Sequence, residues 1–346
     1  MAATIPIIDF SGFYSSDPAA KKAVVDQIRE QCGINGFFQI TGHHVKPELQ
    51  KGVLHWSKKF FALPDEAKQT CSKEKNTWNR GYEMLRSQIL EEGTQPELKE
   101  GFYIGADLPT DHPYFVQKKL NSGPNQWPAA GFEGADLDGF KSGTMDYYHA
   151  TVSLASDVLQ ALALSLDLEP TFFEKFLDGA VATMRLLHYP VQPPDSDAKL
   201  TRGIGAHTDF GAITLLLQDD VDGLQVWDQN TSTWIDVEPV PGAYVINLGN
   251  LMQRWTNEKY KSNVHRVINR SGRERFSVPL FVSGNPDYMV ECIPNCKAPG
   301  EPSKFPPISV EAAVSSGYAE SYGRAQRFKQ GLEAAPAASA SVAASA

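Results

Sequence analysis

The chain has 346 residues, 42% hydrophobic and 21% charged, which is typical of a globular protein with one large or two small domains. Its formal net charge of −9 at pH 7 argues against nucleic acid and anionic membranes as partners. No apolar run is long enough to predict a transmembrane helix, and the start lacks the basic and apolar regions of a secretory signal.

The first half of the chain is predicted to be mostly helical, with a few short strands. Residues 5–10 (IPIIDF) and 33–43 (GINGFFQITGH) predict strands, because β-prone residues stand between turn residues. Between residues 75 and 145 we expect mostly loops around a short run at 99–105, since Gly, Pro, Asn and Asp are frequent. Apolar residues at helical spacing predict helices over residues 17–33, 49–64, 144–166 and 170–178.

The second half is predicted to be mainly β. Short β-prone runs separated by turn residues recur at 182–189, 212–218, 223–227, 233–237, 243–247, 263–269, 274–283 and 287–291. Such spacing predicts a sandwich or barrel, of which the jelly roll is one type. We therefore expect a helical and mixed region over 1–178, a β core over 179–295, a C-terminal helix within 296–330 and a disordered, low-complexity tail over 331–346.

A histidine and an aspartate, His207 and Asp209, stand two residues apart just before the apolar run 212–218. Alternate residues of a strand project to one face, so both side chains would reach a common point. A pair that caps the strand end is the alternative. The one histidine further along is His265, in the run 263–269. Two imidazoles and a carboxylate form the facial triad of non-haem Fe(II) oxygenases, which leaves metal positions open.

An anionic co-substrate is expected at such a metal, because the three ligands leave a net positive charge. Arg275 and Ser277 again stand two residues apart, within the run 274–283. An arginine with a hydroxyl beside it can bind a carboxylate through paired hydrogen bonds. An interstrand salt bridge is the alternative for Arg275.

The order His207-x-Asp209, His265, Arg275-x-Ser277 resembles the iron(II)/2-oxoglutarate dioxygenases of the isopenicillin N synthase-like type. The stretches IPIIDF, GFFQITGH and FFALPDEAK resemble the N-terminal region of that family, and the likeness covers roughly residues 4–325. The resemblance implies a double-stranded β-helix (jelly-roll) core with flanking helices. It also implies that the first three residues bind iron, and that Arg275 and Ser277 bind the distal carboxylate of 2-oxoglutarate.

Four further residues concern the co-substrate and the substrate. By resemblance, Tyr189 reaches the co-substrate; plant members commonly carry Asn two residues earlier, where this chain has Leu187 and so lacks one polar contact. Arg185 shares that strand face and would attract an acidic or strongly polar substrate group, unless it pairs with a neighbouring carboxylate. Phe281 resembles a family position that packs on substrate, with core packing as the alternative.

The remaining candidate residues are expected to be structural. We expect His188 to face away from Tyr189, and the four cysteines to stay reduced in a cytoplasmic compartment, because no CxxC pair is present. Structural roles are also expected for the other histidines, at positions 43, 44, 55, 112 and 149, and for the thiols of Cys292 and Cys296.

The predicted function is a non-haem Fe(II)/2-oxoglutarate-dependent dioxygenase acting on a small-molecule, secondary-metabolite substrate with O2. It would hydroxylate, desaturate or cyclise that substrate and release succinate and CO2, with ascorbate as a helpful addition in vitro. One alternative is a 2-oxoglutarate-independent oxidase of the isopenicillin N synthase type, and another is a non-catalytic jelly roll that binds a small molecule. Nothing in the sequence requires more than a monomer.

Overall fold

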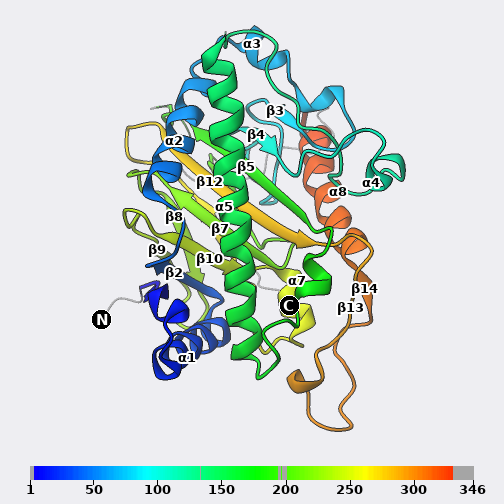
Figure 1. Ribbon diagram of the computed structural model, residues 1–346. Coiled ribbons are helices and arrows are strands. Elements are labelled where there is room, and N and C mark those ends of the chain that lie inside the picture. The colour runs from blue at the N-terminus through cyan, green and yellow to red at the C-terminus, as the bar shows by residue number, and fades with distance from the viewer. Residues whose placement is uncertain (1–3, 133, 194–195, 197–200, 330–346) are drawn as a thin grey trace.

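Two facing β-sheets form the core, in a computed structural model that describes residues 4–132, 134–193, 196 and 201–329 (Figure 1). The larger sheet has the strand order β1 (Ile7–Asp9), β2 (Phe37–Thr41), β10 (Tyr244–Leu248), β7 (Ile213–Gln218), β12 (Arg275–Gly284), β5 (Val181–Tyr189), β4 (Glu100–Ile104) and β3 (Gly81–Glu83). The smaller sheet has the order β6 (Ile204–His207), β11 (His265–Val267), β8 (Leu224–Asp228) and β9 (Thr233–Asp236). This arrangement confirms the predicted jelly-roll core.

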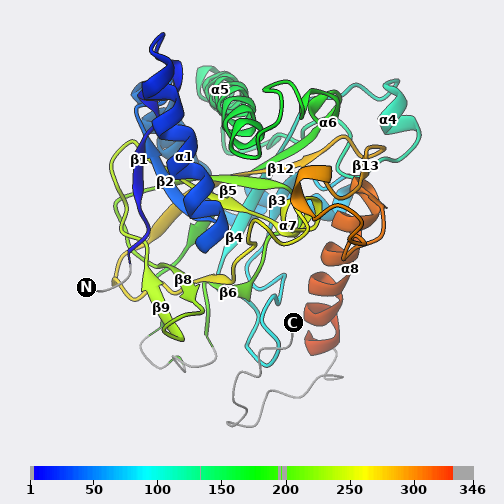
Figure 2. The ribbon, with the colours of Figure 1, turned by 90° about the horizontal axis from the view of Figure 1, so that it is seen from below.

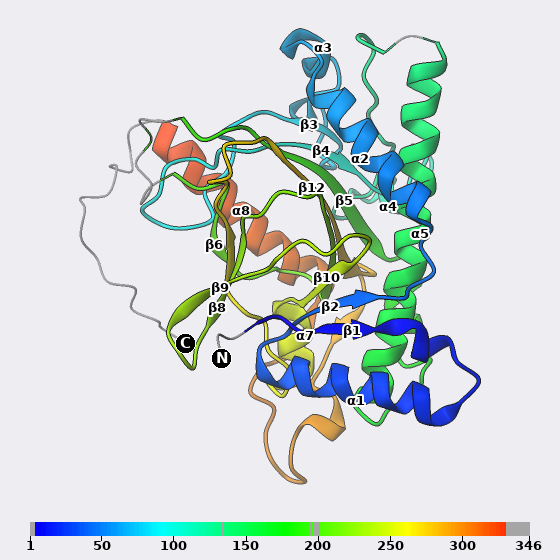
Figure 3. The same ribbon diagram turned by 90° about the vertical axis from the view of Figure 1, so that its left-hand side faces the viewer.

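Helices cover one side of the larger sheet, and the smaller sheet lies on the other (Figures 2 and 3). The covering helices are α1 (Pro18–Ile34), α2 (Pro47–Phe61) and α5 (Ala135–Ser165), while α8 (Val310–Lys329) contacts β12 of the larger sheet. Among the described residues, no helix combines the length and the apolar character needed to cross a membrane. Shorter elements complete the chain: η1 (Phe10–Tyr14), α3 (Asp65–Gln69), η2 (Lys73–Lys75), α4 (Pro113–Val116), α6 (Glu174–Leu177), α7 (Asn250–Trp255), β13 (Met289–Val290), η3 (Pro294–Cys296) and β14 (Ile308–Ser309).

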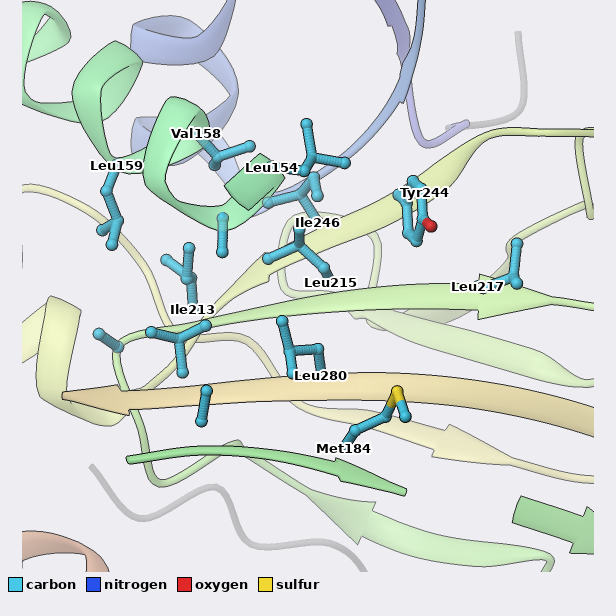
Figure 4. Close-up of a cluster of buried hydrophobic side chains, with 14 of the residues drawn as sticks. Leu154, Val158, Leu159, Met184, Ile213, Leu215, Leu217, Tyr244, Ile246 and Leu280 are labelled. Atoms are coloured by element: carbon cyan, nitrogen blue, oxygen red, sulfur yellow. The ribbon is translucent and has the colours of Figure 1, made fainter. Parts of the chain in front are cut away.

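The alternation of side chains in β7 separates the hydrophobic core from the interior between the sheets. Ile213 and Leu215 point toward α5 and pack with Leu154 and Val158 of that helix, and all four are buried (Figure 4). Burying a side chain of this size stabilises the fold by about 2 kcal/mol. Thr214, in between, points to the opposite face and lines a cavity between the sheets. The core under α5 thus fixes which side chains reach that cavity.

The predicted strands of the second half are present, although two of them are shorter than expected. The run 263–269 contains only β11, and the run 287–291 contains only β13. Strand β6 was not predicted, because its residues Ile204–His207 include a glycine and lie beside a polar loop. Strands β1 to β4 of the first half extend the larger sheet, so the first 178 residues contribute to the β core as well as to its helical cover.

Helix α5 begins at Ala135, nine residues before the predicted start, and its first turns contain two glycines of the stretch in which frequent Gly, Pro, Asn and Asp predict loops. Both glycines lie against the ring of Trp56. A Cβ at Gly139 would lie 2.6 Å from Cζ2 of that ring, and one at Gly143 would lie 2.7 Å from Nε1. Their small size therefore permits close helix packing instead of ending the helix. The predicted helix 170–178 shortens to α6, and the predicted tail 331–346 lies outside the described residues.

Candidate active site

Two histidines face each other across neighbouring antiparallel strands of the smaller sheet. His207 ends β6 and pairs directly with His265, which begins β11, so their ring centroids lie 4.3 Å apart. The Nε2 atoms lie 3.6 Å and 3.7 Å from Oδ1 of Asp209. One ligand atom from each of the three residues lies within 4.8 Å of the other two. The three predicted residues therefore converge on one point.

The explanation by strand alternation is wrong for Asp209. Strand β6 ends at His207, and Asp209 lies in the loop that leads to β7. The loop turns the carboxylate back toward the imidazoles. Backbone hydrogen bonds hold the loop in place, including one from the backbone N–H of Asn250 to the backbone carbonyl of Asp209 at 2.8 Å. Gly249 approaches this loop so closely that a Cβ there would lie 2.2 Å from the Gly211 carbonyl oxygen, so a side chain at position 249 would displace the loop.

Each imidazole is oriented through its other nitrogen. Nδ1 of His207 lies 2.8 Å from the Gly205 carbonyl oxygen, and Nδ1 of His265 lies 3.2 Å from the Asn263 carbonyl oxygen. A carbonyl only accepts hydrogen bonds, so each Nδ1 donates its proton. The Nε2 lone pairs are then free to bind a cation at the point where they meet Asp209.

Asp209 is oriented by two donors that the sequence did not reveal. Its Oδ2 accepts hydrogen bonds from Oγ1 of Thr214 at 2.5 Å and from Nδ2 of Asn247 at 2.7 Å. These residues come from β7 and β10, and both line the interior cavity. Because Oδ2 carries both bonds, Oδ1 faces the two Nε2 atoms without competition. A polar residue on the inward face of a buried strand was the one available signal for either donor.

The protonation states suit a cation. Burial, together with the nearby His207, lowers the pKa of His265 to about 4, so this imidazole is neutral near pH 7. Burial raises the pKa of Asp209, but the two imidazoles and the Asn247 amide outweigh it and hold that pKa well below its usual value. The group therefore presents a neutral nitrogen and a carboxylate, the forms in which these side chains bind metals.

A buried arginine lies on the opposite wall of the same cavity. Arg275 is fully buried; its Nη2 donates to Oε1 of Gln218 at 2.7 Å, and its Nε donates to the Val221 carbonyl at 3.2 Å. Its Nη1 is buried without a hydrogen-bond partner, and within the described ranges no carboxylate forms an ion pair with this side chain. The predicted alternative of an interstrand salt bridge is therefore not observed there. Asp219 acts on Arg275 electrostatically without forming an ion pair, and a buried guanidinium that lacks a directly bound carboxylate is costly unless an anion joins it.

Ser277 and Tyr189 complete this part of the wall. The Ser277 hydroxyl lies 3.5 Å from the Tyr189 hydroxyl, and the Arg275 guanidinium lies 4.9 Å from the centre of the Tyr189 ring. Register explains the grouping, because β12 pairs with β5 so that Arg275 is opposite Tyr189 and Ser277 is opposite Leu187. The buried Leu187 side chain makes the neighbouring wall apolar.

All eight predicted site residues line one cavity of about 900 Å³, a volume that includes its open mouth. The cavity is also lined by residues that were not predicted, among them Lys99 before β4, Phe210 after Asp209, and Tyr318 of α8. Lys99 and Tyr318 are distant in the sequence from the other lining residues, and only the register of β4 and the packing of α8 bring them to the cavity.

The two predicted substrate residues lie beside each other. The Arg185 guanidinium lies 4.9 Å from the centre of the Phe281 ring and 4.3 Å from that of Tyr103. By contrast, His188 faces the other side of the sheet, as predicted, where its Nδ1 lies 2.7 Å from a Glu100 carboxylate oxygen and its ring stacks on Phe276.

Comparisons with known proteins agree with this geometry. The model of the 2OG-Fe(II) oxygenase superfamily matches residues 181–284, and that of the "non-haem dioxygenase in morphine synthesis N-terminal" family matches residues 5–130. The chain is 59% identical over 327 residues to the "2-oxoglutarate-Fe(II) type oxidoreductase hxnY" of Emericella nidulans, covering 94% of this chain and 93% of that protein. The chain belongs to the Fe(II)/2-oxoglutarate-dependent dioxygenases.

Two further comparisons place this dioxygenase among its relatives. It is 44% identical over 291 residues to the 2-oxoglutarate-dependent dioxygenase citB of Monascus ruber, with 83% of this chain and 86% of that protein covered. The crystal structure of a full-length Neurospora crassa protein in complex with alpha-KG and thymine matches with a TM-score of 0.80 and 31% identity. That match covers 91% of this chain and 97% of the other. The dioxygenase thus uses Fe(II), 2-oxoglutarate and O2 on a small molecule.

The residues present suit both groups that the family requires. Two imidazole nitrogens and a carboxylate oxygen form the donor set typical of a non-haem Fe(II) oxygenase. The unpartnered, buried Nη1 of Arg275 suits a carboxylate such as those of 2-oxoglutarate.

Proposed function

We propose that this dioxygenase holds Fe(II) through His207, Asp209 and His265. The observation that supports the proposal is the convergence of their three ligand atoms within 4.8 Å. The backbone acceptors of both Nδ1 protons and the two donors to Oδ2 of Asp209 support it further, because they fix the orientation of each ligand. Bound iron supplies the activation of O2, and these side chains leave part of its coordination sphere open.

The second part of the proposal concerns 2-oxoglutarate. Arg275 and Ser277 bind its distal carboxylate, and Tyr189 contacts the co-substrate from the paired strand. The unpartnered Nη1 of Arg275 supplies a charged donor, and Gln218 holds the other side of the guanidinium at 2.7 Å. Because Arg275 and Ser277 are buried, water is excluded and their interaction with the carboxylate is strengthened. The apolar side chain of Leu187 closes the wall beside them.

The third part concerns the substrate, which we propose to be a small secondary metabolite that is hydroxylated, desaturated or cyclised. A "Clavatol oxidase claD" of Penicillium crustosum is 38% identical over 298 residues, and the matching Neurospora crassa structure contains thymine. Such relatives support a compact, ring-containing substrate. Arg185 and Phe281 contact it, because both line the cavity and lie beside each other.

We also propose a monomeric, cytoplasmic enzyme with the sequence-based division of the chain at residues 178, 295 and 330. All four cysteines are free, which supports a reducing compartment. The two family models match on either side of residue 178, which supports the first boundary.

The test is release of succinate in a screen of candidate metabolites with Fe(II), 2-oxoglutarate and ascorbate. We expect substrate turnover with equimolar succinate, and loss of Fe(II) binding and of turnover in His265→Ala. The matched control is His149→Ala, which removes an exposed histidine of α5 outside the cavity and should retain both. Substrate oxidation without succinate would instead establish an isopenicillin N synthase-type oxidase. Binding without any turnover would establish a non-catalytic binding protein.

A further inference from the structure

A group of buried charges adjoins the proposed substrate residues, and two of its members, Lys99 and Arg185, line the cavity. It contains three cations, Lys73, Lys99 and Arg185, and two carboxylates, Glu83 and Glu97. Four of the five are almost fully buried, and the Lys73 side chain is 12% exposed. Three positive and two negative charges leave a net charge of +1 next to the cavity. Such an excess in a buried site indicates an anion that is not part of the chain.

Both carboxylates are already occupied by the lysines and by other donors. Glu83 lies 2.7 Å from Nζ of Lys73 and accepts a hydrogen bond from the Tyr322 hydroxyl at 2.7 Å. Glu97 lies 2.9 Å from Nζ of Lys99 and also accepts a backbone hydrogen bond at 3.0 Å. Neither carboxylate lies within 4.0 Å of Arg185. Glu83 acts on Arg185 electrostatically, but Arg185 is the one cation of this group that forms no ion pair with either carboxylate.

Arg185 is surrounded by rings and lacks a strong hydrogen-bond partner. Tyr103 and Phe281 come from the strands on either side of β5, and both rings lie within 5 Å of the guanidinium carbon. Among the described residues, Arg185 has one hydrogen bond, from Nη2 to the Tyr318 hydroxyl, which is long at 3.4 Å, and its buried Nε has no partner there. Because rings flank the guanidinium on both sides, its hydrogen-bonding edge is the part left for a ligand.

We propose that Arg185 binds a carboxylate of the substrate itself, so that the substrate is a monoanionic acid with an apolar or aromatic body. This inference rests on the proposed function and adds the substrate class to it. A carboxylate matches the edge of a guanidinium with two hydrogen bonds and neutralises the excess charge. Phe281, Phe210 and Tyr318 line the cavity around this position and would pack against the body of the acid.

The subsite is distinct from the one proposed for 2-oxoglutarate. Arg275 is opposite Tyr189, whereas Arg185 lies four residues earlier on the same strand, which corresponds to about 13 Å along β5. Two buried guanidinium groups without a carboxylate partner in the described part of the chain thus serve two anions, one the co-substrate and the other the substrate.

Benzoate and its neutral isostere benzamide are suitable probes. Each is titrated into enzyme loaded with Fe(II) and saturating 2-oxoglutarate under nitrogen, and binding is measured by calorimetry. We expect benzoate to bind about a hundredfold more tightly than benzamide, as for a buried charge pair. Arg185→Gln should abolish that preference, and Arg185→Lys should retain part of it, because it keeps the charge but loses the paired donors. The control Lys22→Gln, which removes an exposed charge of α1, should keep the full preference.

Four results would overturn the inference. Three of them are equal binding of benzoate and benzamide by the unaltered enzyme, no benzoate binding at millimolar concentration, and a preference that persists in Arg185→Gln. Displacement of 2-oxoglutarate by benzoate would also overturn it, because the probe would then occupy the Arg275 site. The dissociation constant of 2-oxoglutarate, measured on the same samples, separates the two proposals: if 2-oxoglutarate does not bind, the proposed function fails first.

Discussion

Removing the donors to Asp209 should weaken iron binding without removing any ligand. Thr214→Val deletes a hydroxyl and Asn247→Leu deletes an amide, each with little change in shape, and Oδ2 then loses a bond of 2.5 Å or 2.7 Å. A hydrogen bond to a charged group contributes about 1.5–3 kcal/mol. At 1.4 kcal/mol per factor of ten, this corresponds to a rise of about 10- to 100-fold in the dissociation constant of Fe(II).

The assay is an anaerobic competition for Fe(II) against a coloured chelator, which measures affinity independently of turnover. Thr183→Val is the matched control, since Thr183 is an equally buried strand threonine whose hydroxyl contacts Asn121 instead of Asp209. If both donor variants bind Fe(II) within about twofold of the control, the orienting role assigned to Thr214 and Asn247 is refuted.

Three other predictions test the surrounding structure. Arg275→Gln should raise the dissociation constant of 2-oxoglutarate about a hundredfold in a calorimetric titration. An unchanged value would contradict the proposed binding of its distal carboxylate by Arg275. Gly205→Ala should lower stability by about 2 kcal/mol in urea unfolding, because its Cβ would lie 2.6 Å from Cβ of Glu91; Gly52→Ala in α2, which meets no atom within 4 Å, should not. Burial raises the pKa of Glu83, but nearby cations hold it below its usual 4.5, so its stabilisation is present above pH 4.5 and is lost on acidification. The free energy of unfolding of Glu83→Gln should therefore fall less steeply as the pH is lowered. A slope equal to that of the unaltered protein would argue against a stabilising role of the Glu83 carboxylate.

The ligand set could be predicted because its spacing carries chemistry. His207, Asp209, His265 and Arg275 are titratable or charged residues beside or within β-prone runs, and the fold brings them to one cavity. Strand alternation nevertheless does not explain the whole ligand set, since Asp209 reaches the site from a loop and not from a strand.

Other parts of the site depend on register, which the sequence alone does not reveal. Thr214 and Asn247 are ordinary strand residues until β7 and β10 pair and turn both toward Asp209. Lys99 joins the wall only because β4 pairs with β5, and Tyr318 only because α8 packs against the open side of the sheets. The early start of α5 was missed for a related reason, since its glycines serve a contact with a ring far away in the sequence.

The position of Asp209 between the sheets has a mechanical consequence. The imidazoles belong to the smaller sheet, whereas the carboxylate is tethered by side chains of the larger one. An ion held by all three would therefore act as a cross-link between the two halves of the sandwich. Removal of the bound ion by an added chelator should then accelerate amide hydrogen exchange in β6 and β11 more than in β7 or β10. The latter two strands are protected by the helices that cover the larger sheet.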